Sequence, residues 1–488
     1  MPVDSLHPDY TAYLSKWQRM RHVIDGEDAV KAAGVEYLPK LEADNQGDYD
    51  AYKMRAQFFN ATGRTRFAFL GMIFRVPPKV TAPSSLDKFI ADAGLDGQPF
   101  DSYCESIAEE ILSPGRAGTL VDWSDNESRP FVAQYAPECV INWGERRVGD
   151  KMVLDFVVLR EQAESKVADD APAKSAPASG KNAPDKFSPD LVQQIRVLNL
   201  VENNGALQYT VDLFQLKADR RGKKEWVKVE TVTPVRRKQA LTFIPFVFHN
   251  PSGKGSRCER PPLEDLAITN LSHYRTSADL EHGRHYTALP TPWITGVSAT
   301  GKLRIGASTA WEIESAEAKV GMLEFSGAGL ASLKDALEQK EHQMAILGAK
   351  MLEVQKKAAE TAEVQRLKHG GEGAGLINIV NAMSDSMAEV VKIAAWWSSP
   401  ADKKMEEVAK DVSVELNTDF TIAILQPAEI TALVAAYQAN TLTRESLLYN
   451  FERGGLLSPQ RSAEEEAELL DTQVVPDAPG DEPPKPGE

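Results

Sequence analysis

Two histidines in H-x-x-H spacing, His282 and His285, are the residues whose type and spacing come nearest to a metal site. On a helix this spacing places both imidazoles on one face, as a zinc site could require. No nearby cysteine, aspartate or third histidine completes a recognisable set, although His273 lies nine residues upstream. We therefore expect the pair to lie at a solvated or interfacial helix end, where it packs and forms hydrogen bonds.

A second candidate is the stretch GVSATGKL, residues 296–303, which nearly matches the phosphate-loop pattern G-x-x-x-x-G-K-[ST]. Leu303 stands where a hydroxyl would hold magnesium, and the following RIGAS predicts a strand or turn instead of the required helix. A turn between two strands accounts for Gly296 and Gly301. The sequence also lacks G-x-S-x-G and a convincing nucleophile–base pair, so we predict no catalytic residue, metal or cofactor, and no enzyme.

The third candidate is a basic cluster formed by Lys350, Lys356 and Lys357, near the distal end of a predicted helix. One interpretation is a solvated helix face. The other is contact with a phosphate backbone, which positions a nucleic acid without reading its sequence. Both interpretations stay open at this point.

Composition limits the classes of protein to consider. The chain has 488 residues and a net charge of −16, so two or more structural units are expected and non-specific coating of DNA is disfavoured. Cys104, Cys139 and Cys258 are far apart and suit reduced thiols in the cytoplasm. The N-terminal residues MPVDSLHPDY carry no signal peptide, and no run approaches the ~18 apolar residues of a membrane span.

Periodicity predicts helices to about residue 125, with a break at Gly63, and then strands from about 118 to 162. An Ala/Pro/Ser-rich insertion at about 164–186 should be disordered. Asn204-Gly205 lies between two alternating runs and predicts a hairpin with a type I′ turn. Further strands are expected at EWVKVETV and LTFIPFVF. The predicted fold class is α+β, predominantly α-helical.

Two polar helices with narrow apolar seams flank a short Gly-rich, strand-like module. The first seam contains Leu266, Leu271 and Tyr274; in the second, Leu337 and Met344 lie seven residues apart. Leu333 and Leu347 form a companion row, interrupted by Lys340. Such a seam suits packing against neighbouring helices, so we expect these helices to be stable only beside other copies of the chain.

The remaining sequence predicts a helix over 376–397, a strand at TDFTIAIL, and a helical pair at PAEITALVAAYQAN and TRESLLYNFERGG. From Arg461 onward there are nine acidic and two basic residues, and the last part should be disordered.

This order of elements resembles the portal protein of tailed bacteriophages, the ring at one vertex of the capsid. The resemblance covers nearly the whole chain, with the insertion and the acidic tail as departures. It is most specific in four stretches: RAQFFNATGRTRFAFLGMIFR (55–75), GRAGTLVDW (115–123), PPLEDLAITNLSHYRTSADLEHGRHYTALPTPWITG (261–296) and EHQMAILGAKML (341–352).

The resemblance implies a portal fold with wing, stem, clip and crown regions around a central channel. The implied regions are the wing (1–262), the first stem helix (263–286), the clip (287–330), the second stem helix (331–350), the tunnel loop (351–362), a long helix returning to the wing (363–427), the crown (428–470) and a disordered acidic tail (471–488). Pro290 and Pro292 would mark the bend from stem to clip, because proline disfavours helix at the preceding residue.

The resemblance also implies a function in the virion, after assembly in the host cytoplasm. The ring, a dodecamer, would pass double-stranded DNA during packaging and ejection without sequence specificity and without a membrane. Its partners would be the terminase large subunit, head-completion or adaptor proteins, and the major capsid and scaffolding proteins. Lys350, Lys356 and Lys357 would contact DNA in the channel. Subunits would pack through seven stem residues: Leu266, Leu271, Tyr274, Leu333, Leu337, Met344 and Leu347.

Two other classes of protein remain as alternatives. A nucleic-acid-processing enzyme would need a complete phosphate loop or a carboxylate metal cluster. A coiled-coil scaffold or adaptor of another assembly would form an elongated dimer or trimer instead of a ring.

Overall fold

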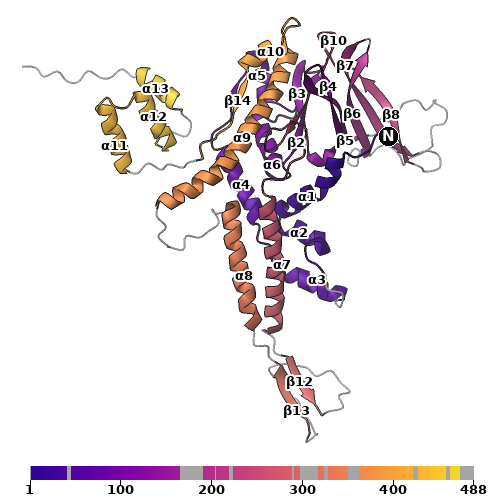
Figure 1. The fold of residues 1–488 in the computed structure, drawn as a ribbon, viewed down its shortest axis with the longest axis vertical. Helices are drawn as coiled ribbons and strands as arrows, with labels where there is room; N and C mark the ends of the chain where they lie inside the picture. The colour runs from indigo at the N-terminus through magenta and orange to yellow at the C-terminus, as the bar shows by residue number, and fades with distance from the viewer. Residues whose placement is uncertain are drawn as a thin grey trace, which may run out of the picture. The chain divides into compact units, whose positions relative to one another are not determined.

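The computed structural model describes residues 2–40, 45–164, 191–203, 205–218, 224–287, 291–296, 317–323, 328–349, 362–420, 427–454, 456–457 and 462–472. The chain divides into two compact units, Met1–Thr418 and Asp419–Glu488. Helices and antiparallel sheets occur together, which confirms the predicted α+β class (Figure 1). The predicted 164–186 insertion lies outside the described residues except for Glu164, which ends a strand.

The N-terminal part of the first unit is helical, as predicted, up to residue 112. Its helices are α1 (Pro8–Asp25), α2 (Glu27–Ala33), α3 (Gln46–Arg55), α4 (Ala61–Ile73), α5 (Asp87–Ala91) and α6 (Phe100–Leu112), with 3-10 turns at Gly34–Glu36, Ser84–Leu86 and Pro137–Cys139. The predicted break at Gly63 is wrong, because Gly63 lies in the first turn of α4. Asn60 caps this helix by accepting the Gly63 amide at 2.8 Å, and a Cβ on Gly63 would lie only 2.7 Å from the Asn60 side chain.

Two antiparallel sheets follow. The three-stranded sheet has the order β11-β2-β3 and the five-stranded sheet the order β4-β5-β6-β7-β8. Their strands are β2 (Ala117–Ser124), β3 (Arg129–Tyr135), β4 (Val140–Val148), β5 (Lys151–Glu164), β6 (Leu191–Asn203), β7 (Ala206–Ala218), β8 (Lys224–Val232) and β11 (Phe246–His249). Asn203 pairs with Ala206 and Gly205 has φ 78°, so the predicted hairpin with a two-residue turn is confirmed.

Short strands complete the first unit. They are β1 (Lys79–Thr81), β9 (Val235–Arg236), β10 (Gln239–Ala240) and β14 (Ser413–Glu415). β1 pairs with β14, and β9 pairs with β10. The strand predicted at 418–425 is absent from the part of it that the structure describes, Thr418–Phe420, and the nearby strand is β14 instead. The predicted strand LTFIPFVF is reduced to its second half, β11.

A buried hydrogen-bonded chain connects the small sheet to its covering helices. His249 on β11 lies between Thr119 on β2 (Nε2 to Oγ1, 2.7 Å) and Ser386 (Nδ1 to Oγ, 2.8 Å). Thr119 in turn bonds the Tyr103 hydroxyl of α6 at 2.7 Å. Ser386 belongs to α9 (Ala362–Ser398), the long helix that confirms the one predicted at 376–397. Burial lowers the pKa of His249 to about 3, so the imidazole is neutral at pH 7.

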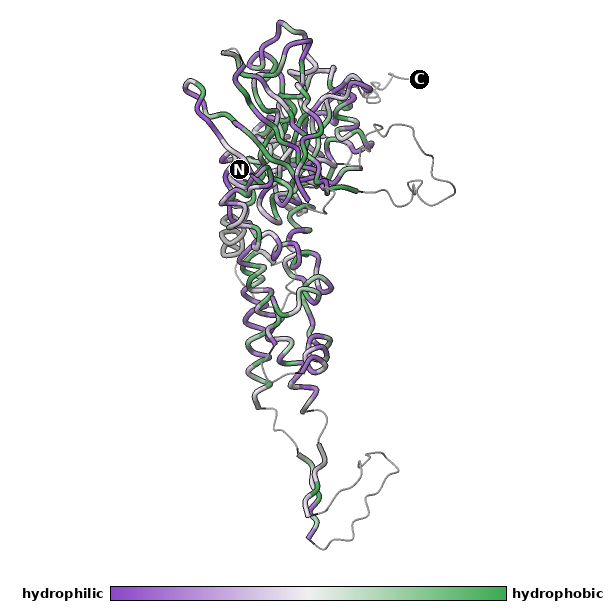
Figure 2. Tube along the Cα trace, turned by 90° about the vertical axis from the view of Figure 1, so that its right-hand side faces the viewer, coloured by the Kyte–Doolittle hydropathy of each residue, from purple (hydrophilic) through white to green (hydrophobic). Residues whose placement is uncertain are grey.

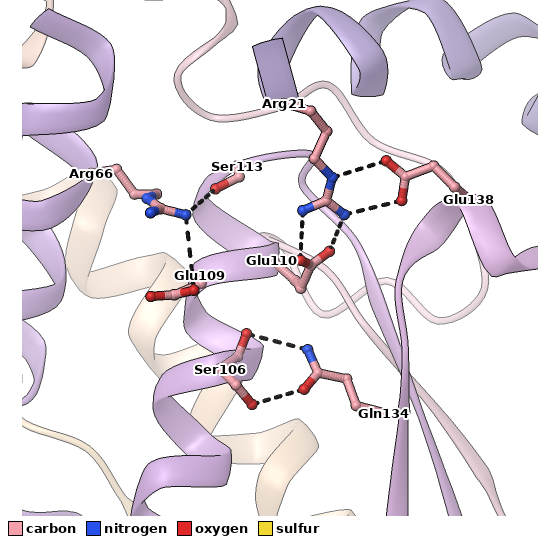
Figure 3. Close-up of polar contacts among 8 residues, drawn as sticks. All are labelled: Arg21, Arg66, Ser106, Glu109, Glu110, Ser113, Gln134 and Glu138. Carbon is pink, nitrogen blue, oxygen red and sulfur yellow. Dashed lines mark hydrogen bonds and ion pairs between the residues drawn. The ribbon is translucent and has the colours of Figure 1, made fainter. Parts of the chain in front are cut away.

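An arginine on α1 holds the N-terminal helix against the rest of the unit. The Arg21 guanidinium donates to both Glu110 oxygens at 2.6 Å and to both Glu138 oxygens at 3.0 Å (Figure 3). These hydrogen bonds raise the pKa of Arg21 against the opposing effect of burial. Because Arg21 forms a bidentate, charged hydrogen-bonded contact with each of two glutamates, it holds α1 against α6 and against the 3-10 turn Pro137–Cys139.

The two polar helices predicted from the sequence are present. They are α7 (Glu264–Thr287) and α8 (Ala328–Met344), which a π-helical turn, η4 (Ala345–Ala349), extends. Between them the chain forms a hairpin of β12 (Thr291–Thr295) and β13 (Lys319–Leu323). α7 and α8 lie side by side (Figure 1), and Figure 2 shows hydrophilic and hydrophobic residues mixed along the helices.

The second unit contains three short helices, α11 (Pro427–Gln438), α12 (Arg444–Arg453) and α13 (Ala463–Thr472). The first two confirm the predicted helical pair. The third extends to Thr472 and so includes the first two residues of the predicted disordered tail, 471–488; the rest of that tail lies outside the described residues. Arg444 holds α12 to α13 through an ion pair with Asp471 and a 3.1 Å bond to the Ala467 carbonyl.

Candidate assembly surface

The apolar stripe of α7 is buried within a single chain. Leu266, Leu271 and Tyr274 belong to a core that also includes side chains from α1, from α2 and from the start of α4. The expectation that this stripe depends on other copies of the chain is wrong, because the N-terminal helices already cover it. These three residues, predicted to form subunit contacts, therefore contribute intrachain packing in this structure.

The apolar residues of α8 divide into two groups. Met344 is buried in the same core, so it too packs within the chain. Leu333 and Leu337 are half-buried, and Leu347 is exposed together with its neighbour Ile346. Of the seven predicted contact residues, only these three leucines keep surface that a neighbouring copy could cover.

Polar contacts hold α7 and α8 together as an antiparallel pair. The Lys340 ammonium donates to the Ser272 carbonyl at 3.1 Å and also bonds the Thr276 hydroxyl. Burial and the neighbouring Arg275 lower the pKa of Lys340. His273 lies 3.3 Å from Glu341, and burial lowers the pKa of this histidine although Glu341 opposes the shift. The sequence showed Lys340 only as an interruption of the apolar row, whereas the structure gives it partners on α7.

The H-x-x-H pair lies at the end of α7, as predicted. The His282 ring meets the Tyr52 ring edge-on at 5.1 Å, and the Tyr52 hydroxyl donates to Asp279 at 2.6 Å. His285 is exposed. Within the described ranges no three His, Cys, Asp or Glu side chains gather as a metal site.

The β12–β13 hairpin exposes apolar side chains on both faces. Trp293 pairs with Gly321, where a Cβ would lie 2.7 Å from the indole, so only glycine fits beneath the ring. Val320 and Met322 are more than half exposed on the other face. A two-stranded hairpin is marginally stable alone in water. This surface is consequently a candidate for contact with another protein.

Backbone geometry marks the end of α8. Gly348 has φ 128°, and a Cβ there would lie 3.3 Å from Thr65 and 3.4 Å from the Phe69 ring of α4. Gly348 lies inside η4, packs against α4, and has a backbone conformation that favours glycine. Three predicted channel residues, Lys350, Lys356 and Lys357, lie beyond this point and outside the described residues, as does Pro290. Pro292 is the second residue of β12.

The most telling polar residue that the sequence analysis missed is Asn270 on α7. It is fully buried, and its Oδ1 accepts both the amide and the hydroxyl of Thr62 at 3.1 and 3.0 Å. Its Nδ2 donates to the Phe59 carbonyl at 2.7 Å. The available signal was an asparagine at a position on the predicted helix next to the apolar residues Ala267 and Leu271. A buried side-chain amide is nearly always hydrogen-bonded.

Comparison with known proteins gives limited similarity. A family described as "Domain of unknown function (DUF4055)" matches residues 262–398, the part from α7 through α9. No curated protein matches the sequence. No helix in the described part of the chain is long and apolar enough to cross a membrane.

Three solved structures match the chain at low similarity. The neck of a native GTA particle computed with C12 symmetry has a TM-score of 0.38 and 12% identity, over 81% of this chain and 89% of that chain. The virion of a native gene transfer agent particle gives 0.37 and 12%, over 84% and 94%. The neck of an empty GTA particle computed with C6 symmetry gives 0.39 and 11%, over 85% and 90%.

Proposed function

We propose that the chain is a phage-type portal protein, a non-enzymatic structural component of the virion. Copies would form a ring at one capsid vertex and enclose the channel through which double-stranded DNA is packaged and ejected. The terminase large subunit would dock on the ring first and head-completion or adaptor proteins afterwards. The major capsid and scaffolding proteins would surround it. The dodecameric state is carried over from the sequence resemblance.

The observation that carries the proposal is the hairpin inserted between two antiparallel helices. The last described turns of α7 and the first of α8 are in contact, since a Cβ on Gly283 would lie 2.6 Å from Leu330. The chain therefore leaves and re-enters the helix pair at the same end, with β12 and β13 between. Exposed apolar side chains on that hairpin suit a docking module at the end of a helical stem.

The wing, clip, tunnel loop and crown remain proposed regions. In the proposed arrangement, residues 1–262 form the wing, α7 and α8 the stem, and β12–β13 part of the clip. The tunnel loop, 351–362, would follow Gly348 and carry Lys356 and Lys357 toward DNA. A few lysines in an otherwise acidic protein would touch the phosphate backbone transiently without holding it.

Electron microscopy of the purified full-length chain tests the proposal directly. We expect closed rings with a central hole, and native mass spectrometry should give one dominant multiple of 53.6 kDa. An elongated dimer or trimer would favour the scaffold or adaptor alternative. ATPase or nuclease activity that copurifies with a monomer would favour the enzyme alternative. Either outcome would overturn the portal assignment.

A further inference from the structure

Two exposed patches lie on different neighbours of α7, and we infer that each is the binding site for the other on an adjacent copy of the chain. One is the outer face of α4, and the other is formed by α2, the turn Gly34–Glu36 and α3. We call them the α4 patch (Arg64, Phe67, Gly71) and the α3 patch (Asp28, Val35, Asp50, Met54). The inference rests on the proposed ring and names the surfaces that would build it.

The α4 patch is basic and apolar. Arg64, Phe67 and Gly71 are spaced three and four residues apart, so they share one helix face, opposite the buried Thr65 and Ile73. Phe67 is 76% exposed, and a Cβ on Gly71 would meet open space. The segment 61–79, which begins with α4, contains four basic residues and no Asp or Glu, although the whole chain is strongly acidic.

Arg64 has no carboxylate partner among the described residues. Its guanidinium lies over the Phe59 ring, 5.5 Å from the ring centroid, in a cation–π contact. A large exposed aromatic side chain beside an arginine is the composition that interfaces favour.

The α3 patch is apolar with a small acidic excess. Its segments 27–36 and 46–55 contain five acidic residues and three basic ones, Lys31, Lys53 and Arg55. Met54 is 71% exposed and Val35 62% exposed. Lys31 holds the two elements together by donating to the Met54 carbonyl at 3.2 Å while pairing with Glu27 at 2.5 Å. Asp28 and Asp50 are exposed. Neither aspartate forms an ion pair with a described residue; Asp50 accepts a hydrogen bond from the Gln46 side chain at 3.0 Å on one oxygen, which leaves the other for a cation.

The two patches lie on opposite sides of α7. Asn270 of α7 contacts the start of α4, whereas Asp279 contacts Tyr52 of α3. Nine residues separate these anchors, which corresponds to about half a turn around the helix and about 14 Å along it. Figure 1 shows α3 and α4 on either side of α7. Since each helix turns its buried face inward, the exposed faces point away from each other.

Two complementary patches on opposite flanks of one chain suit a head-to-tail contact, which closes into a ring when the rotation between copies allows it. Arginine and phenylalanine on one copy would meet aspartate and methionine on the next. An isologous dimer cannot bury both patches, because it uses one face of each copy and the two patches lie on opposite flanks.

The test uses one disabled patch per variant. Phe67→Asp disables the α4 patch, and Met54→Arg disables the α3 patch. Each variant alone should lose the ring and run as a monomer in native mass spectrometry. A 1:1 mixture should give a heterodimer that grows no further, because one intact patch of each kind remains. Met152→Asp, at a residue 61% exposed on β5, is the matched control and should still form rings.

The outcomes separate this inference from the proposed function. Rings formed by both variants, or a mixture that stays monomeric, would overturn the inference while wild-type rings still supported a portal. A wild-type chain that forms no closed ring would overturn the proposed function. Circular dichroism and thermal melting should match wild type for every variant. Should either variant misfold, Arg64→Glu and Asp50→Arg replace the pair, with the same expected pattern in the mixture.

Discussion

Asn270 of α7 receives two hydrogen bonds from Thr62, at 3.1 Å from its amide and 3.0 Å from its hydroxyl. The contact spans more than two hundred residues of sequence and fixes the first turn of α4 against α7. Through this contact, α7 of the predicted stem positions α4, the helix that carries Phe67, the most exposed phenylalanine of the described residues.

Asn270→Leu should destabilise the first unit by about 3 kcal/mol, because the amide and hydroxyl donors of Thr62 would be left buried without partners, whereas the Phe59 carbonyl keeps its bond from the Ala61 amide. The measurement is the free energy of unfolding from a urea titration monitored by circular dichroism. Ile268→Ala, two residues away at an exposed position, should change it by less than about 0.5 kcal/mol. A small loss for Asn270→Leu would mean that water or a rearranged side chain replaces the amide.

Acid should destabilise the first unit through His249. Its pKa is lowered to about 3 in the folded chain and returns toward 6.5 on unfolding. Below about pH 6.5 the imidazole is therefore protonated in the unfolded chain, whereas the buried imidazole of the folded chain stays neutral. The free energy of unfolding should fall by about 1.4 kcal/mol per pH unit from this residue until the pH nears the folded value.

His249→Gln should remove that contribution, although its stability at pH 7 should also be lower because the hydrogen bonds to Thr119 and Ser386 change. Urea titrations between pH 7 and pH 4.5 measure the slope for both chains. His285→Gln, at an exposed position, is the control. Equal slopes for wild type and His249→Gln would contradict the assigned protonation.

Replacing apolar residues of α8 should separate folding from assembly. Met344→Glu buries a carboxylate in the core, so we expect several kcal/mol of destabilisation and little folded protein. Leu337→Glu, at a half-buried position, should leave the chain folded and weaken the ring. Thermal melting followed by native mass spectrometry distinguishes the two effects. Intact rings from Leu337→Glu would remove α8 from the proposed subunit contact.

Neutralising Lys356 and Lys357 together, as glutamines, should reduce DNA retention or packaging while rings form normally. The expected cause is the loss of transient contacts between the proposed tunnel loop and phosphates. Packaged DNA per particle is the measurement, and Lys334→Gln on the exposed surface of α8 is the matched control. Failure of ring assembly in the double variant would show that these lysines are structural.

The sequence by itself determined the local elements. Prolines and acidic residues at the start of α7, the Asn204-Gly205 turn and the alternating strands around it are local signals, and the structure bears them out. Only the tertiary structure decided what the apolar seam of α7 contacts, because a stripe of Leu266, Leu271 and Tyr274 fits another copy or the N-terminal helices equally well. Partner choice depends on contacts between residues distant in sequence, such as Thr62 with Asn270, and periodicity carries no information about them. For the same reason, only the tertiary structure decides which faces of α3 and α4 are exposed, because it decides which faces are buried.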